Sequence, residues 1–166
     1  REYQKDVMKN VMMPAMARPA HDRVEKRMDA LRQYAETSGI NTVEYNDRRI
    51  GIIAAGTSYT YAREALGERA SYLKLGMVNP LPIQMIIEFA RNVGQVYVIE
   101  ELDDIIETHC RKHGIPVIGK LLFPTCGEFS QKTVREALLG EELPTQSFTA
   151  APIPPRPPVL CAGCPH

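Results

Sequence analysis

Short apolar runs alternate with helical patterns between residues 50 and 139, and this alternation limits the fold more than any other feature of the chain. The apolar runs are 50–55, 72–77 and 95–99, and the first and the third are rich in β-branched side chains. Apolar residues at helical spacing follow each run, at 59–66, 82–91 and 102–113. Strands that alternate with helices of ~10 residues form crossover units. The sequence therefore predicts an α/β fold with three layers, in which helices cover both faces of a mainly parallel sheet.

Residues at the ends of these segments predict where elements begin and stop. The small residues 56–58 predict a tight turn in which a hydroxyl caps the following helix. Pro82 suits the first turn of the helix that reaches Arg91. Residues 116–118 predict a short fourth strand, and Ser130 is expected to cap a last helix that ends near Gly140.

Residues 1–38 precede this pattern. Because Pro14 and Pro19 interrupt a helix, residues 1–19 are expected to form an arm that lies across a neighbouring surface. Apolar residues recur at helical spacing from 20 to 36, which predicts one amphipathic helix that stops at Ser38-Gly39.

A proline-rich stretch follows the predicted α/β domain of residues 39–143. Six of the fifteen residues 144–158 are proline, which excludes a helix or a central strand and predicts a stiff interdomain linker. Residues 159–166 would then open a further domain. With Arg1 as first residue and a cysteine motif at the end, the chain is expected to be a segment of a longer polypeptide.

Composition excludes several classes of protein. Of the 166 residues, 44% are hydrophobic and 24% are charged, which suits a globular core without disulfides and excludes disorder throughout. The formal net charge of zero predicts no nucleic-acid partner and no binding to an anionic membrane. No apolar run approaches the ~20 residues of a membrane span, and no signal peptide is visible. Four cysteines favour a reducing cytoplasm over secretion.

The loops after the three predicted strands are the first candidate site. In open parallel sheets a ligand crevice lies at the carboxyl ends of the strands. The candidate crevice or interface residues there are Gly56, Thr57, Ser58, Glu100, Glu101 and Asp103. The first loop has one glycine where a dinucleotide fingerprint needs three, so a helix-capping turn is favoured over nucleotide binding.

Four carboxylates crowd into residues 100–104. Acidic side chains stabilise the first turn of a helix, and Asp103 or Asp104 is expected to cap it. Glu100 and Glu101 would point to opposite faces of an extended chain, so one of them is expected to face the crevice or an interface. No histidine or nucleophile is adjacent in sequence, and no catalytic residue is predicted.

Histidine and cysteine residues give a second set of candidates. Cys161 and Cys164, in a C-x-x-C turn followed by His166, could bind a metal or cluster iron, or form a redox pair. His109 and His113 lie four apart on a predicted helix; one packed and one exposed histidine is favoured over a shared metal. Cys110 and Cys126 are expected to be small buried hydrophobes.

Five segments in order resemble the alpha subunit of indolepyruvate ferredoxin oxidoreductase, and together they extend over nearly the whole chain. They are Val11-Met12-Met13-Pro14-Ala15-Met16-Ala17-Arg18, Ala55-Gly56-Thr57-Ser58-Tyr59-Thr60-Tyr61, Leu73-Lys74-Leu75-Gly76-Met77-Val78-Asn79-Pro80-Leu81-Pro82, Val98-Ile99-Glu100-Glu101-Leu102-Asp103, and Arg156-Pro157-Pro158-Val159-Leu160-Cys161-Ala162-Gly163-Cys164-Pro165-His166. In that family the segment is similar to the transketolase C-terminal-like domain.

The resemblance implies an anaerobic enzyme that uses thiamine diphosphate, Mg²⁺ and [4Fe-4S] clusters. It would oxidise aryl-pyruvates to acyl-coenzyme A, with ferredoxin as electron acceptor, coenzyme A as co-substrate and a beta (gamma-type) subunit as partner. The other domains of the same chain would hold the metal-diphosphate motif and the ferredoxin-type cysteines, so this segment alone is expected to be inactive.

The same resemblance places the terminal motif at the start of the diphosphate-binding domain. His166 would then lie at the thiamine pocket, and Cys161 and Cys164 would be iron–sulfur ligands, a structural turn or a reversible disulfide. Two alternatives of other classes stay open: a self-contained Cys/His metal or redox module, and a non-catalytic assembly domain that dimerises through residues 1–19.

Overall fold

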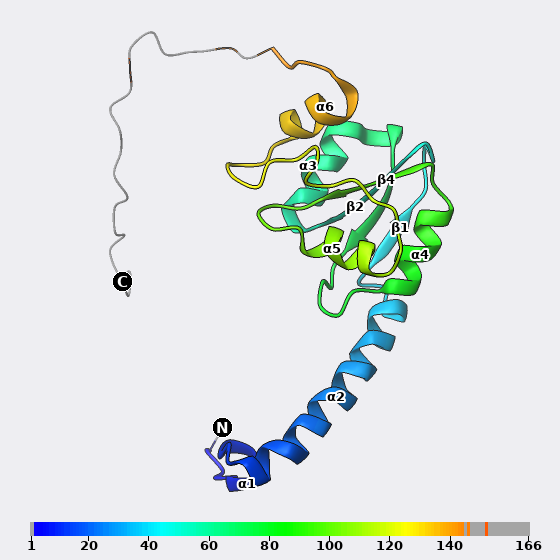
Figure 1. The fold of residues 1–166 in the computed structure, drawn as a ribbon. Coiled ribbons are helices and arrows are strands. Elements are labelled where there is room, and N and C mark those ends of the chain that lie inside the picture. Colours follow the sequence, from blue (N-terminus) through cyan, green and yellow to red (C-terminus); the bar gives the residue numbers. More distant parts are fainter. Residues whose placement is uncertain (1, 145, 147–151, 153–166) are drawn as a thin grey trace.

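A four-stranded sheet forms the centre of the computed structural model, which describes residues 2–144, 146 and 152. The strands are β1 (Thr42–Glu44), β2 (Ile50–Ala55), β3 (Ser71–Leu75) and β4 (Gln95–Ile99), in the order β1-β3-β2-β4 (Figure 1). Strand β2 pairs in parallel with β3 and β4, whereas β1 is antiparallel to β3. The predicted mainly parallel sheet is confirmed. Strand β1 was not predicted, because Thr-Val-Glu contains no apolar run.

Helices cover both faces of the sheet. They are α3 (Gly56–Leu66), α4 (Ile83–Arg91), α5 (Ile105–Lys112) and α6 (Gln131–Leu139), and a short 3₁₀ turn spans Gly67–Arg69. Ile53 of β2 packs with α4 and α5, while its neighbours Ile52 and Ala54 pack with α3 and α6. This alternation is the period-two pattern of a strand that is buried on both faces. The three-layer α/β fold is confirmed.

Helix α2 (Pro14–Thr37) extends away from the α/β layers and carries the short helix α1 (Val7–Asn10) at its far end (Figure 1). The expected break at Pro19 is wrong, because one helix runs through this residue. Pro19 is the sixth residue of α2, so its ring deprives only the carbonyl of Ala15 of a donor. Ala15 and Pro19 are both exposed, and water can reach that carbonyl.

The C-terminal end of α2 is fixed to the domain by Glu36 and Asn41. The Glu36 carboxylate accepts hydrogen bonds from the amides of Gln84 and Met85, both at 2.9 Å. The Asn41 side chain donates to the carbonyl of Ala35 at 2.8 Å and accepts from the backbone amides at 76 and 77. Ala35 is the buried residue of α2. The helix is therefore attached at one end.

Several predicted boundaries differ from the structure. The predicted strand 72–77 is β3 at 71–75, and the predicted strand 116–118 is reduced to one bridge between Tyr97 and Ile118. Helix α5 begins three residues later than expected, because Leu102 has a φ of 56°, in the left-handed region that a helix does not use.

The last helix agrees with its predicted signals. The Ser130 hydroxyl accepts from the amide of Thr133, and Gly140 ends α6 in the left-handed conformation with a φ of 64°. Most of the predicted linker 144–158, and all of residues 159–166, lie outside the described residues. Among the described helices, none combines the length and apolarity that crossing a bilayer demands.

Candidate functional site

The carboxyl edge of the sheet is the place where the sequence predicts a crevice. The register sets Ala55 beside Leu75 and Ala54 beside Ile99, so the loops after β2, β3 and β4 start at one edge. Helix α3 leaves this edge toward one face of the sheet, whereas α4 and α5 lie on the other. Such a divergence is the topology that opens a crevice in doubly wound folds.

The predicted loop Gly56-Thr57-Ser58 is the first turn of α3 itself. Gly56, with a φ of 52°, turns the chain from β2 directly into the helix, so no separate loop supplies a capping side chain. Ala55 is the N-cap residue and makes no side-chain bond, which corrects the expected hydroxyl cap. Gly56 and Thr57 are exposed, and Ser58 is buried.

Glu100 is buried and caps helix α5. Its two carboxylate oxygens accept from the amides of Ile106 at 2.8 Å and Glu107 at 2.9 Å. The expected cap by Asp103 or Asp104 is therefore wrong: Asp104 is the N-cap residue, but its carboxylate accepts from the hydroxyl of Thr108. A strand-end glutamate reaches the second and third amides of the helix more directly, because β4 points at them. Glu101 and Asp103 are exposed at the edge.

A second buried carboxylate lies beside the first. Glu107 accepts from the backbone amide of Lys120 at 2.7 Å and pairs with Arg111 at 2.6 Å. The Lys120 ammonium group donates to the carbonyl of Glu100 at 2.5 Å. Burial raises the pKa of Glu100, and the amides of Glu107 and Ile106 partly oppose that shift. Both carboxylates are engaged in structural hydrogen bonds, so this edge offers a rigid surface and not an acid–base pair.

His109 and His113 lie side by side on α5, with ring centroids 4.9 Å apart. His109 is half-buried, and burial lowers its pKa, aided by His113 and Lys112. No group of three histidine, cysteine or acidic side chains with metal-binding geometry occurs within residues 2–144. Cys161, Cys164 and His166 lie outside the described residues.

The two described cysteines differ in their surroundings. Cys110 is buried, as expected, and burial raises its pKa to about 12. Cys126 is exposed, so its expected burial is wrong. It lies in the loop before α6, where no sheet face or helix stripe covers it.

For thiamine diphosphate and Mg²⁺, the carboxyl edge in the described part of the chain offers the uncapped amides that open α3 but no metal-binding cluster beside them. A diphosphate is held by free amides at a helix start together with a metal. The amides that open α4 and α5 are already bound by Glu36 and Glu100. Residues 2–144 also lack a cluster of three metal-binding side chains.

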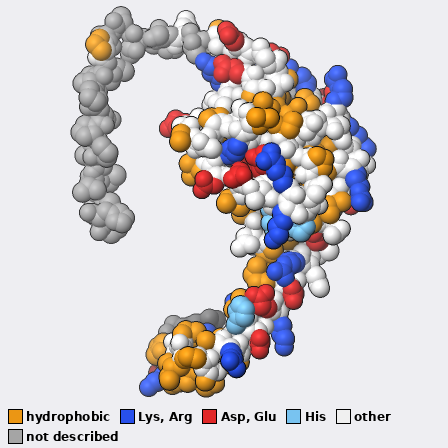
Figure 2. Space-filling view, in the orientation of Figure 1, with side chains coloured by type: hydrophobic (Ala, Val, Ile, Leu, Met, Phe, Trp, Pro, Cys, Tyr) orange, Lys and Arg blue, Asp and Glu red, His pale blue; other side chains and the backbone are white. Residues whose placement is uncertain are grey.

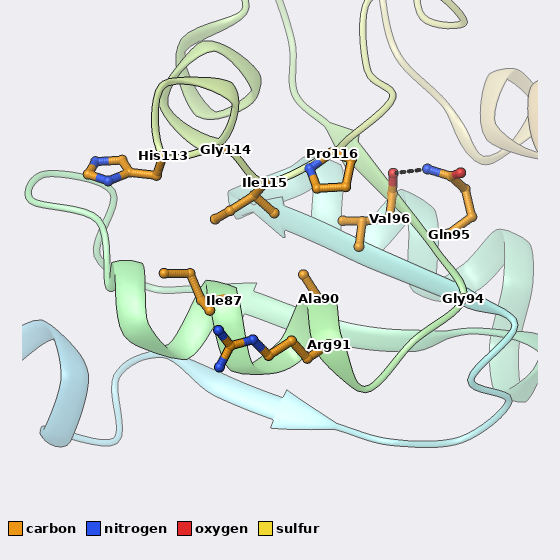
Figure 3. A pocket seen from close by; sticks show the side chains of 10 residues that line it. All are labelled: Ile87, Ala90, Arg91, Gly94, Gln95, Val96, His113, Gly114, Ile115 and Pro116. Atoms are coloured by element: carbon orange, nitrogen blue, oxygen red, sulfur yellow. Dashed lines mark hydrogen bonds between the residues drawn. The ribbon is translucent and has the colours of Figure 1, made fainter.

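A surface groove between α4 and α5 was not predicted from the sequence. It consists of two adjoining hollows of about 900 and 420 Å³ that share Ile87 and His113 in their linings. In the smaller hollow, Ile87 and Ala90 of α4 face residues 113–116 (Figure 3). The spacing of Ile83, Ile87 and Ala90 is a sequence signal for this surface, but a buried stripe has the same spacing.

Comparison with known proteins shows relatives over nearly the whole chain. Indolepyruvate oxidoreductase subunit IorA of Archaeoglobus fulgidus is 34% identical over 183 residues, which cover 99% of this chain and 29% of that subunit. The IorA subunit of Thermococcus kodakarensis is 32% identical over 187 residues, with the same coverage. This chain is homologous to a segment of the IorA subunits. It spans about 29% of the length of these curated relatives. No protein-family model matches it.

A solved structure shows the same fold as this IorA-like segment. The 2-oxoglutarate:ferredoxin oxidoreductase from Magnetococcus marinus, with 2-oxoglutarate, coenzyme A and succinyl-CoA bound, superposes with a TM-score of 0.59. The match has 17% identity and covers 78% of this chain and 24% of that one. The α/β architecture of the IorA-like segment therefore also occurs as a part of a much longer oxidoreductase chain.

Proposed function

We propose that this chain is a non-catalytic structural domain of a thiamine-diphosphate-dependent indolepyruvate:ferredoxin oxidoreductase in the cytoplasm. The whole enzyme would convert aryl-pyruvates to acyl-coenzyme A and pass electrons through [4Fe-4S] clusters to ferredoxin. Thiamine diphosphate and Mg²⁺ would be held by other domains of the polypeptide, and a beta (gamma-type) subunit would complete the assembly. The boundaries 39–143 for this domain and 144–158 for its linker belong to the same proposal.

The observation that carries this proposal is the match of 99% of the chain to IorA subunits. The described site supports a structural role, because the buried carboxylates Glu100 and Glu107 bind backbone amides instead of facing a cavity. At the carboxyl edge, Gly56, Thr57, Glu101 and Asp103 remain exposed. We assign these four residues to contacts with the neighbouring cofactor-binding domains. Cys161, Cys164 and His166 would belong to the following domain.

A segment exchange tests the proposal. The matching segment of the Archaeoglobus fulgidus IorA subunit is replaced by this chain, and the chimera is purified anaerobically with its partner subunit. Indolepyruvate-dependent reduction of a viologen dye is measured with coenzyme A, thiamine diphosphate and Mg²⁺. We expect the chimera to oxidise indolepyruvate, because a structural domain from a homologue preserves the fold that supports the site.

Two controls define the outcome. A subunit from which the segment is deleted is expected to be inactive, and the 166-residue chain alone is expected to show no oxidation under the same conditions. A chimera that folds and assembles with its partner but oxidises no 2-oxo acid would overturn the proposed function. Turnover by the isolated chain would overturn the non-catalytic role.

A further inference from the structure

The groove between α4 and α5 has an apolar floor and a basic rim. Its floor is formed by Ile83, Ile87 and Ala90 of α4, and Ile105 of α5 lies at its opening. Ile105 is 67% exposed, although it begins a helix whose next residue, Ile106, is buried. Ile83, Ile87 and Ile105 line the same hollow, and such a contiguous apolar surface, unlike a single exposed side chain, is typical of a surface that a partner covers.

The positive charges at the rim favour a negatively charged partner. Arg91 and Lys112 line the groove together with the two histidines of α5, and so does Arg32, which forms an ion pair with Asp29 of its own helix. Figure 2 shows Lys, Arg and His side chains gathered where α2 meets the domain. Glu36 is the acidic residue of the lining, and its carboxylate is bound by two amides of α4. The groove therefore presents positive charge around apolar side chains.

Helical walls limit the form of the partner. The edge strand β4 contributes Gln95 and Val96 to the smaller hollow, but Ile118 already bonds the outer edge of this strand at Val96 and Val98. The helices α4 and α5 bond most of their own backbone, so the groove offers little free backbone to an extended peptide. A helix satisfies its own backbone and needs only an apolar stripe to fill such a groove. Small anions are disfavoured, because Glu36 and Glu100 occupy the amides that open both helices.

We propose that this groove binds an amphipathic, acidic helix of another protein. The apolar stripe of that helix would lie on Ile87 and Ile105, and its carboxylates would pair with Lys112 and Arg91. Residues 145–166 of this chain contain no acidic residue and include Arg156, so they lack the complementary charge.

The test uses the 166-residue chain with ¹³C-labelled isoleucine methyl groups and a synthetic helix as probe. The probe is a capped peptide of about 15 residues, long enough to form a helix, with leucine at i, i+4 and i+7 and glutamate on the other faces. One control peptide has the same composition with the leucine stripe scrambled, and a second has lysine in place of glutamate. We expect saturable methyl shifts at Ile87 and Ile105 with the acidic helix alone.

Charge reversal provides the matched variants. Arg91→Glu combined with Lys112→Glu should weaken binding about tenfold, because two attractions at the rim are replaced by repulsions. Lys5→Glu combined with Lys9→Glu changes the net charge equally at the far arm and should leave binding unchanged. All four side chains are exposed, so both variants should fold.

Four results would overturn the proposal. They are no shift at Ile87 and Ile105, equal shifts with the scrambled peptide, shifts of these methyls on dilution of the free chain, and shifts on deletion of residues 145–166. The third result would show that a second copy fills the groove. The last would show that the chain's own tail does.

Discussion

One buried carboxylate, that of Glu100, determines where α5 starts and makes the stability of the chain depend on pH. The Glu100 side chain, five residues before the first residue of α5, satisfies two amides of that helix without a local turn. The sequence indicates an acidic residue here, but it does not show which of four carboxylates reaches the amides. That choice depends on the direction in which β4 ends.

Ionisation of Glu100 should make the chain less stable as the pH rises. Its folded-state pKa is raised above the ordinary 4.5, so its contribution is complete below 4.5 and is lost as the pH rises through the folded pKa. Glu100→Gln cannot ionise and should remove this slope. The measurement is the free energy of urea unfolding from pH 4 to pH 8. Glu101→Gln, at the exposed neighbour, should keep the wild-type slope; parallel curves for all three proteins would refute the assignment.

Cys110 and Cys126 should react with alkylating reagents at very different rates. The Cys110 thiol is buried, with a pKa raised to about 12, so it has little thiolate at neutral pH. Cys126 is exposed. Brief iodoacetamide treatment followed by peptide mass spectrometry should find Cys126 modified and Cys110 intact. In urea both peptides should be modified, and rapid labelling of Cys110 in the native chain would contradict its placement.

Among the elements, those with local signals were predicted well. Strands β2 and β4 were predicted at their observed bounds, because each is a continuous apolar run buried on both faces. Helix α6 followed from its serine cap and its terminal glycine. The start of α5 and the cap of α4 could not be predicted, because Glu100 and Glu36 act across 6 and 48 residues. The groove depends on how α2, α4 and α5 pack, which no local pattern contains.

Removal of the Glu36 carboxylate should weaken the attachment of α2 to α4. Glu36→Ala leaves the amides of Gln84 and Met85 without their acceptor, which should cost about 1 kcal/mol of unfolding free energy. Hydrogen exchange at these two amides should accelerate. The control is Glu25→Ala on the exposed surface of the same helix, where the cost should stay below about 0.5 kcal/mol. Equal costs for the two variants would show that Glu36 does not fix the helix.

At the scale of the whole molecule, the N-terminal arm, residues 2–32, forms few stabilising contacts with the α/β layers. Apart from the backbone bonds within α2 itself, the described hydrogen bonds and ion pairs of residues 2–32 join residues of that range. The buried residue of α2 is Ala35, near its last turn. Charge balance and hydrophobic content agree with one such domain, but they do not show that its N-terminal helix projects.

Deletion of residues 1–19 should therefore leave the domain's stability nearly unchanged. The thermal midpoint followed by near-ultraviolet circular dichroism should move by less than about 2 °C, because a shift of that size corresponds to well under 1 kcal/mol. Far-ultraviolet ellipticity should fall with the loss of α1 and the first turns of α2. A large drop in the midpoint would reveal contacts between the arm and the layers.

Because α2 is attached at one end, a small tilt at that end produces a large displacement of the other. Its 24 residues span about 36 Å, so a tilt of about 10° at Glu36 would move the far end by about 6 Å. The far end carries the exposed apolar side chains of Val7, Met8 and Met12. A protein that binds those residues would tilt α2. Because Glu36 is bonded to the first turn of α4, the tilt would displace that turn and change the width of the groove beside it. Because Met28, Arg32 and Glu36 of α2 line the larger hollow, a movement of the arm would reach the groove directly.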